Sequence, residues 1–371
     1  MQIPLRLVLL VRPSVAPGVL LAVGFSTMAV VATPFLIQPV ADHYDIGLTR
    51  ASLIGVAQLA GFVAGSWGSG RFLRPRRRVF VAALGLAVVA NLTSALLPPF
   101  AVLIALRLLS GFTLGLLSWF GWVQVFGEEK GTADVAVVGP VAGILTGPLL
   151  AVFAGGGAST LFALLGCLAV VPLLFNAGTG AADRVAPRRP RSRPVPAAAL
   201  ILVALGLYTV GGSSVFTYVV VLAAGEPGLP VSTVALLFSA NSIAAIPATR
   251  WPWRRGWPAP WMLATGGAAV VLTNATHPVL FAASVVIWGF FFWMAVPGVF
   301  AALAARSANP ADRAGDAQAI MAAGRVVGPF IGGLMFDAAG ATALGLTGAA
   351  IIAGAASVVF VVRSMVEPAE S

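Results

Sequence analysis

Long apolar stretches alternate with short polar connections along almost the whole chain. Each stretch is close to the roughly 20 residues with which a helix crosses the ~30 Å hydrocarbon core of a bilayer. Because lipid offers no partner to backbone N–H and C=O groups, such stretches are predicted to be α-helices. The predicted crossings lie near residues 17–40, 50–70, 79–97, 99–126, 133–154, 158–175, 197–224, 231–249, 259–276, 279–304, 317–338 and 341–362. The pattern therefore predicts an all-α membrane protein with twelve transmembrane helices.

The composition agrees with this fold class. Of the 371 residues, 59% are hydrophobic and 9% are charged, which is far outside the range of soluble globular domains. The first apolar stretch follows Arg6 and Arg12, as in a signal peptide, but it is longer than the apolar core of one. We expect it to stay in the mature protein.

The net charge of +10 is concentrated in every second connection. The basic residues of these connections are Arg71, Arg74, Arg76, Arg77, Arg78, Lys130, Arg184, Arg188, Arg189, Arg191, Arg193, Arg250, Arg254, Arg255, Arg306, Arg313 and Arg363. The opposite connections hold Asp42, Asp45 and Glu226, with Arg50 as the one clear basic residue. Loop arginines and lysines stay on the cytoplasmic side, so we predict a multi-pass protein of the cytoplasmic membrane with both termini inside. The basic loops are short and scattered, so no nucleic-acid partner is expected.

Residues that would carry enzyme chemistry are scarce. Cys167 is alone in an apolar stretch, and His43 and His277 are far apart, so no metal site or disulfide framework is predicted. The chain has no Walker loop, no catalytic Ser/His/Asp set and no HExxH motif. We therefore expect neither enzyme activity nor a cofactor.

An internal repeat divides the chain into two halves. The spacing GxxxGP occurs in predicted helix 5, at Gly143, Gly147 and Pro148, and again in predicted helix 11, at Gly324, Gly328 and Pro329. The offset is 328 − 147 = 181 residues, which corresponds to six helices. Residues 177–196, rich in Pro, Gly, Ala and Arg, separate the halves and are typical of a flexible linker. We predict two pseudo-symmetric six-helix bundles, 1–176 and 197–371, joined by a cytoplasmic linker over 177–196.

Four motifs resemble those of the major facilitator superfamily, in the same order as in that family. They are RLLSGFTLG at 107–115 in helix 4, GILTGP at 143–148 in helix 5, GRVVGPFIGGLMFD at 324–337 in helix 11, and GSWGSGRFLRPRRR at 65–78 between helices 2 and 3. The last is a degraded copy, because the aspartate usual in that loop is replaced by Ser69 or Gly70. The resemblance covers essentially the whole chain and is closest to the drug and metabolite efflux branch. It implies a monomeric secondary transporter that moves a small organic solute by alternating access, with membrane lipid around it.

The glycine motifs are candidate hinges. Small residues four apart let helix backbones approach closely, and a proline inside a helix removes one hydrogen bond and allows a bend. We expect helices 5 and 11 to form tight contacts between the two bundles through Gly143, Gly147, Pro148, Gly324, Gly328 and Pro329. Plain packing without a hinge role is the alternative. Arg71, in the loop after helix 2, is the candidate for gating at the inner face.

Two charges lie well inside predicted crossings, where an unpaired charge costs about 2.5–3.5 kcal/mol on insertion scales. Arg107, in helix 4, shares a stripe with Gly111, Gly115 and Trp119. Two interpretations are open for it, a conformational or proton-linked role and a cap on the carbonyls of a neighbouring helix. Arg325, in helix 11, contacts an anionic or polar solute in one interpretation and serves the structure in the other.

Further pocket candidates come from the resemblance, which implies that helices 1, 4, 7 and 10 face the central pathway. Helix 10 carries Trp288 and Phe292, helix 7 carries Tyr208 and Tyr218, and helices 2 and 8 add Gln58 and Asn241. Aromatic walls with a few polar groups suit an amphipathic organic solute. With Arg107 and Arg325, these residues form the predicted substrate-binding set. Phe291 and Trp293 point away from Trp288, so part of the helix 10 cluster must face elsewhere.

Carboxylates are missing from the middle of every predicted crossing. Asp134 and Asp316 lie at inner ends and Asp337 at an outer end. Three possibilities stay open: protons coupled through Asp134 or Asp316, protons carried by an acidic substrate, or no coupling. The motifs of helices 5 and 11 favour efflux by antiport. The buried arginines favour the alternative, uptake or facilitated exchange of an organic anion.

Overall fold

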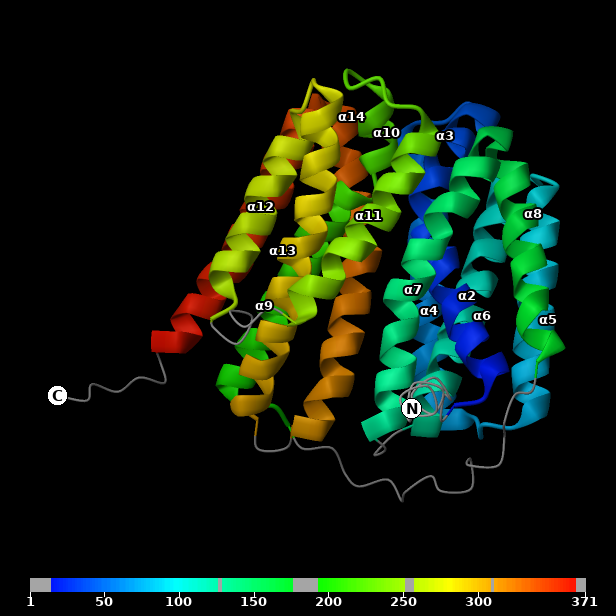
Figure 1. The fold of residues 1–371 in the computed structure, drawn as a ribbon, viewed down its shortest axis with the longest axis horizontal. Coiled ribbons are helices and arrows are strands. Elements are labelled where there is room, and N and C mark those ends of the chain that lie inside the picture. Colours follow the sequence, from blue (N-terminus) through cyan, green and yellow to red (C-terminus); the bar gives the residue numbers. More distant parts are fainter. Residues whose placement is uncertain (1–14, 126–128, 176–192, 251–256, 308–309, 365–371) are drawn as a thin grey trace, which may run out of the picture.

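The computed structural model describes residues 15–125, 129–175, 193–250, 257–307 and 310–364, and in these ranges all regular structure is helical. The first half contains α2 Pro17–Val31, α3 Thr33–Tyr44, α4 Leu48–Phe72, α5 Arg77–Ala95, α6 Phe100–Val125, α7 Glu129–Phe153, η1 Ala154–Gly156, α8 Gly157–Val170 and η2 Val171–Leu174. The second contains α9 Pro196–Phe216, α10 Val219–Ala224, α11 Val231–Arg250, α12 Ala259–Thr273, α13 Pro278–Ala305 and α14 Pro310–Ser364. In Figure 1, α4 to α8 stand on the right, and α9, α12, α13 and α14 stand on the left. The predicted division at residues 176 and 197 stays a prediction, and residues 177–192 of the linker lie outside the described ranges.

Prolines fix where several helices begin. Pro17, Pro196 and Pro278 occupy the first helical position of α2, α9 and α13, where a backbone N–H has no partner to lose. At α13 the preceding His277 completes the cap, because its Nδ1 accepts a hydrogen bond from the backbone N–H of Val279 at 3.2 Å. Pro34 instead follows a break, since its missing N–H prevents α2 from continuing smoothly into α3. The two helices meet at an angle of 47°.

Two glycines with matching backbone angles reverse the chain in the two halves. Gly157 has φ 77° and ψ −169°, between η1 and α8, and Gly340 has φ 74° and ψ −169°, inside the span assigned to α14. Positive φ is inexpensive only for glycine. Gly157 lies ten residues after Gly147, and Gly340 lies twelve residues after Gly328. In Figure 1, α14 runs up to this break and then descends to the lower left. The internal repeat therefore extends beyond the GxxxGP motif to the turn that follows it.

The described helices suit a bilayer. Eight are long and apolar enough to cross a membrane, or nine if the bent pair α2 and α3 is one span. Two of the eight stretches, Val138–Leu174 and Ala319–Arg363, contain the glycine reversals, and α12 is a shorter apolar helix. The total of twelve crossings stays a prediction. Large apolar side chains face outward at mid-helix, for example Val89 and Leu145, as contact with lipid requires.

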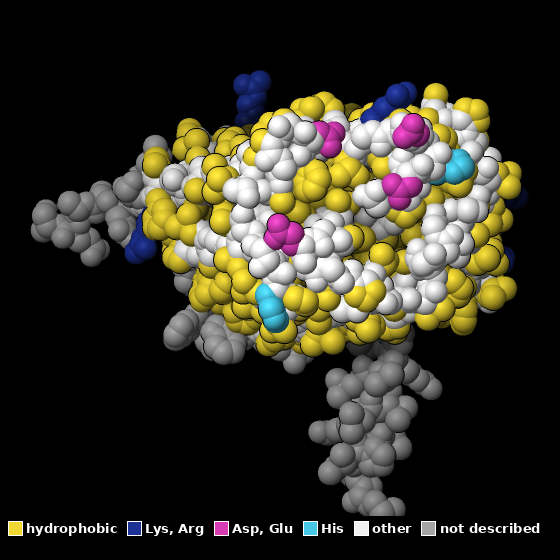
Figure 2. Space-filling model, turned by 90° about the horizontal axis from the view of Figure 1, so that it is seen from above, with side chains coloured by type: hydrophobic (Ala, Val, Ile, Leu, Met, Phe, Trp, Pro, Cys, Tyr) yellow, Lys and Arg dark blue, Asp and Glu magenta, His cyan; other side chains and the backbone are white. Residues whose placement is uncertain are grey.

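The two ends of the molecule differ in charge. α2 begins and α14 ends at the bottom of Figure 1, the same end at which α4 is joined to α5 by the basic connection after residue 72. The top face carries acidic side chains and histidines among apolar and neutral ones, with basic side chains at its rim (Figure 2), in agreement with the predicted outer positions of Asp42, Asp45 and Glu226. The compartment that each face meets stays a prediction from the distribution of arginine.

Candidate functional site

Arg107 is enclosed inside the first bundle and has no exposed surface. Its guanidinium donates to the Asn91 side-chain oxygen at 3.0 Å, to Ser94 Oγ at 2.8 Å and to the Ala90 carbonyl at 3.3 Å. All three partners lie on α5, and the ring of Phe162, on α8, lies 4.5 Å from the guanidinium carbon. These contacts match the interpretation of Arg107 as a cap on a neighbouring helix. They give no support to its predicted contact with substrate.

The glycines after Arg107 face a different helix. A Cβ on Gly111 would lie 1.8 Å from the Gln58 carbonyl oxygen, and one on Gly115 would lie 2.1 Å from that of Phe62, both on α4. The sequence predicted that Arg107 and these glycines share one stripe of the helix. In the structure the arginine faces α5 and the glycines face α4, so the motif tightens the packing within one bundle.

Arg325 has different surroundings. No hydrogen bond or ion pair of its guanidinium is present within the described ranges, and the residue is half-buried. At 100° per residue, its direction on α14 lies between Gly328, about 60° to one side, and Gly333, about 80° to the other. Gly328 packs on Val210 and Ser213 of α9, and Gly333 packs both on Tyr218, just after α9, and on Thr49 of α4. Gly332, only about 20° from the direction of Arg325, packs on Ser214 of α9. Arg325 therefore lies on the side of α14 that adjoins α9, next to the side that meets the other bundle.

The amides of the predicted set hold helices together. Gln58 Nε2 donates to the Ala29 carbonyl at 3.1 Å, next to the break between α2 and α3, and Thr33 Oγ1 donates to the same carbonyl at 3.2 Å. Asn241 Nδ2 donates to the Val285 carbonyl on α13 at 2.7 Å. Both side chains thus bond to the backbone of a neighbouring helix in the same half of the chain. Their predicted contact with substrate stays a prediction.

The two tyrosines are also engaged. Tyr208 OH shares a hydrogen bond with Thr265 Oγ1 at 2.9 Å, and its ring stacks on Phe292 with centroids 5.4 Å apart. Tyr218 OH donates to the Pro329 carbonyl at 2.8 Å, so it fastens α14 to the end of α9 at the proline of the motif. Both tyrosines have no exposed surface.

Trp288 belongs to an aromatic chain that the sequence analysis did not find. Its ring lies 5.9 Å from Phe216, which lies 5.0 Å from Phe238, which lies 5.0 Å from Phe35. These four residues come from α13, α9, α11 and α3, so this aromatic chain extends from one half of the protein to the other. Phe291 packs on Trp261 instead, as expected from the rotation of helix 10. No sequence pattern connects the members of this aromatic chain.

The GxxxGP motif of helix 5 lies between the bundles. A Cβ on Gly143 would lie 2.4 Å from Ser242 Oγ, and one on Gly147 would lie 2.0 Å from Ser239 Oγ and 2.5 Å from the Ala235 carbonyl. Ser239 Oγ also donates to the Ile144 carbonyl at 2.6 Å. These serines are on α11, in the other half, so α7 and α11 approach closely where Pro148 interrupts the hydrogen-bond ladder of α7. A hinge role for this contact stays a prediction.

The motif of helix 11 does not make the predicted contact. A Cβ on Gly324 would lie 2.1 Å from Thr209 Oγ1, and one on Gly328 would lie 2.0 Å from Ser213 Oγ, and both partners are on α9 of the same half. Ser213 Oγ donates to the Gly324 carbonyl at 3.2 Å. The expectation that these glycines join the bundles was wrong. The contact of α14 with the other bundle lies further along the helix, at Gly333.

A polar contact at the top of the molecule joins the halves and was also missed. The Asp337 carboxylate accepts from Thr49 Oγ1 at 2.5 Å and from the Thr49 backbone N–H at 3.2 Å. Thr49 is in the first turn of α4, where unpaired N–H groups and the helix dipole favour a negative charge. The two residues are 288 positions apart, so no local pattern could pair them.

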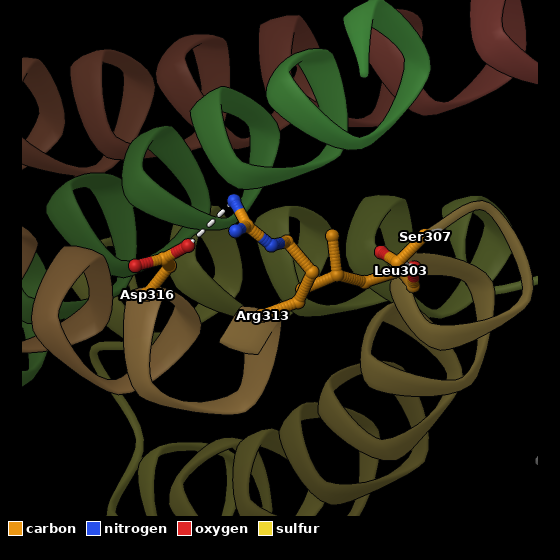
Figure 3. A network of polar contacts seen from close by, with 4 residues as sticks. All are labelled: Leu303, Ser307, Arg313 and Asp316. Atoms are coloured by element: carbon orange, nitrogen blue, oxygen red, sulfur yellow. Dashed lines mark hydrogen bonds and ion pairs between the residues drawn. The ribbon is translucent and has the colours of Figure 1, made fainter. Parts of the chain in front are cut away.

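The remaining candidates have varied positions. At the inner end of α14, Arg313 and Asp316 form an ion pair of 2.7 Å, with Arg313 buried (Figure 3). The side chains of Arg71 and Asp134 lie outside the described residues, so the predicted gate and one of the two proton-coupling candidates stay predictions.

A hollow of about 530 Å³ opens beside Phe35, Gln38, Asp42 and His43, at the outer end of α3. None of the predicted substrate-binding residues lines it.

Known proteins with a similar sequence pattern or fold indicate the family of this chain. The family model described as "Uncharacterised MFS-type transporter YbfB" matches residues 19–362. A comparison with curated protein sequences gives no match. Solved structures match over nearly the whole chain at low identity. The human organic anion transporter MFSD10 (TETRAN) has a TM-score of 0.66 at 15% identity, covering 94% of this chain and 100% of its own.

Two further structures agree. A bacterial homolog of the human lysosomal transporter Spinster, inward-facing and occupied, has a TM-score of 0.71 at 12% identity, with 97% of each chain covered. The nucleoside transporter NupG has a TM-score of 0.66 at 13% identity, covering 94% of this chain and 99% of its own. The fold is therefore that of the major facilitator superfamily. The protein is a membrane protein of secondary transport and not an enzyme. The chain belongs to the family of the MFS-type transporter YbfB.

Proposed function

We propose that this protein moves a small organic anion across the cytoplasmic membrane by alternating access, and that Arg325 contacts the anionic group. The observation that carries the proposal is the Arg325 guanidinium, which lies in a membrane-spanning helix without a hydrogen bond or ion pair in the described ranges. An arginine stays protonated in proteins, so this site keeps its positive charge throughout a transport cycle.

The chemistry of the guanidinium favours carboxylate or phosphate groups. Its planar fork of N–H donors matches two oxygens at once, and charge-assisted hydrogen bonds are about twice as strong as neutral ones. A positive charge in a membrane-spanning helix is costly when it is unpaired. An anionic solute would remove that cost on binding, whereas a cationic solute would add to it.

Contacts near the top of the molecule support alternating access. The Asp337–Thr49 contact and the α7–α11 contact join the halves, whereas the helices of the two halves diverge toward the bottom of Figure 1. A state open at the top would have to break the first contact and loosen the second. The glycines of α7 and the serines of α11 are small, so these two helices can approach closely and shift against each other.

Direction is a separate proposal. Efflux by antiport is favoured by the resemblance of residues 143–148 to an antiporter motif. Uptake or facilitated exchange is the second candidate, and the same arginine serves it. Two of the similar structures are named as transporters of organic anions and of nucleosides. At their low sequence identity, the similarity concerns the fold alone. Proton coupling through Asp134 or Asp316, protons carried by an acidic solute, and no coupling all stay open.

Transport in proteoliposomes tests the proposal. A panel of labelled organic acids and their uncharged amide analogues would be offered to protein carrying Arg325, Arg325→Gln or Arg193→Gln. We expect flux of at least one acid, no flux of its amide, a loss of at least tenfold with Arg325→Gln, and full flux with Arg193→Gln. Arg193 is an exposed arginine before α9, so it controls for net charge. Acid flux that survives Arg325→Gln would overturn the proposal.

Direction is read in whole cells. Cells that overproduce an exporter accumulate less of the labelled acid than control cells, and cells that overproduce an importer accumulate more. Equal accumulation across the panel would count against both directions.

A further inference from the structure

Two arginines and a tryptophan meet at the inner end of the second half of the chain. The ring centroid of Trp257 lies 4.9 Å from the guanidinium carbon of Arg306 and 5.8 Å from that of Arg363. Trp257 comes just before α12, Arg306 caps the end of α13, and Arg363 is in the last turn of α14. We call these three residues the Trp257 cluster. Three separate parts of the chain build it, so it depends on the tertiary fold.

Two donors of the cluster have no acceptor among the described residues. Arg306 Nε and Trp257 Nε1 are buried, and neither has a hydrogen-bond partner in the part of the chain that the structure describes. Both atoms can only donate. A buried donor without an acceptor loses its hydration and gains nothing in return. An acceptor from outside the chain would satisfy both.

The charge of the cluster points to the same kind of ligand. The two guanidinium carbons are no further apart than the sum of their distances to the ring, about 11 Å. Stacking on the electron-rich ring offsets part of their repulsion. Within the described ranges, no ion pair joins Arg306 to a carboxylate. An anion beside Arg306 would supply that counter-charge directly.

A purely structural role explains only part of this arrangement. Cations at the ends of α13 and α14 interact favourably with the helix dipoles. That effect requires neither the shared tryptophan nor the burial of Nε and Nε1. Arg107 Nε is also a buried donor without a described partner, but it lies in a closed site inside one bundle. In the Trp257 cluster two such donors lie together at the end of the helices, and this combination suits a ligand.

We propose that the Trp257 cluster binds a phosphate group. Arginine recognises phosphate through paired N–H donors, and tryptophan prefers the membrane interface. The cluster lies at the predicted inner face, where anionic phospholipids and soluble phosphates are both available. The shared chemistry is a phosphate oxygen that accepts from Arg306 Nε and Trp257 Nε1.

The test separates the two sources of phosphate. Full-length protein would be placed in nanodiscs of phosphatidylcholine alone, or with added phosphatidylglycerol, or with inorganic phosphate in the buffer. Thermal unfolding and native mass spectrometry would report stabilisation and bound lipid. The variants are Arg306→Gln, Trp257→Phe and, as the matched control, Arg193→Gln.

We expect phosphatidylglycerol to raise the Tm of the unmodified protein and to remain bound in the mass spectrum. Arg306→Gln should weaken this binding at least tenfold, and Trp257→Phe, which keeps a ring and removes one donor, about three- to tenfold. Arg193→Gln should bind as the unmodified protein does. The same dependence with inorganic phosphate would assign the site to a soluble anion, and its absence would assign it to a lipid headgroup.

The proposal fails if neither phosphate source raises the Tm. It fails equally if stabilisation is the same in all three variants, because that would indicate general attraction of anions to a basic face. Trp257→Phe keeps the net charge, so it tests the site even if Arg306→Gln does not fold. The proposal is independent of the transported solute.

Discussion

Arg107 and Arg325 are both arginines inside membrane-spanning helices, but they differ in burial and in hydrogen-bond partners. Arg107 is fully buried among Asn91, Ser94 and the ring of Phe162. Arg325 is half-buried and has no partner in the described ranges. The comparison shows that a charge in the membrane interior is not by itself a sign of a solute site. What matters is whether the fold already supplies its hydrogen-bond partners.

The same distinction divides the other polar candidates. Gln58 and Asn241 donate to backbone carbonyls, and Tyr208 and Tyr218 use their hydroxyls on Thr265 and Pro329. Each of these groups already has a protein partner, whereas the Arg325 guanidinium has none among the residues that the structure describes. If the distinction is valid, changes at partnered groups should alter stability, and changes at Arg325 should alter solute recognition.

The largest effect is expected from Arg107→Ala. The change removes the cation from a closed site and leaves a cavity and unpaired acceptors on α5, which should cost about 3–5 kcal/mol of stability. Arg325→Ala should change stability by only about 0.5 kcal/mol, because no described hydrogen bond or ion pair is lost. Thermal unfolding of the two purified variants, followed by tryptophan fluorescence, makes the comparison. Equal losses in Tm would mean that Arg325 has partners of its own in the folded protein.

Next in size are the matched glycine variants Gly328→Ala and Gly147→Ala. Each new Cβ would overlap a serine hydroxyl on the facing helix, and overpacking costs about 1–3 kcal/mol. Gly328 faces α9 within one bundle, so its variant should lower the Tm. Gly147 faces α11 in the other bundle, where the helices can separate, so its variant should lower the Tm less.

Hydrogen exchange distinguishes the two variants further. Gly147→Ala should speed amide exchange at the outer ends of α7 and α11, and Gly328→Ala should not. Faster exchange of those segments in both variants would show that the helix 11 glycines also control the contact between bundles.

A smaller effect is expected from Asp337→Asn, which keeps the size of the side chain and removes its charge. Loss of the charge at the start of α4 should cost about 1 kcal/mol, because a carboxylate there bonds to Thr49 and favours the helix dipole. Hydrogen exchange in the first turn of α4 should become faster. Asp45→Asn, at an exposed outer position, is the control and should leave that exchange rate unchanged.

The sequence predicted the helical architecture well, but it did not predict which neighbouring helix each side chain contacts. Apolar length and the repeated GxxxGP spacing depend on local sequence, so they predicted a helical membrane protein with two related halves. The facing of Gly324 and Gly328 depends on how far α14 is rotated against two neighbours, and one motif cannot specify that. The partners of Arg107, the aromatic chain from Phe35 to Trp288, and the bond between Asp337 and Thr49 join distant helices, so they emerge only with tertiary packing.

Equilibrium binding is the most direct test of the central claim, that Arg325 is the cation that recognises an anionic solute. Calorimetric titration of purified protein with the organic acids that it transports would be compared between the unmodified chain, Arg325→Lys and Arg325→Gln. We expect strong binding in the first, weaker binding with lysine, because it keeps the charge but loses the planar fork, and at least a tenfold loss with glutamine. Equal affinity of all three proteins for the same acid would contradict the account.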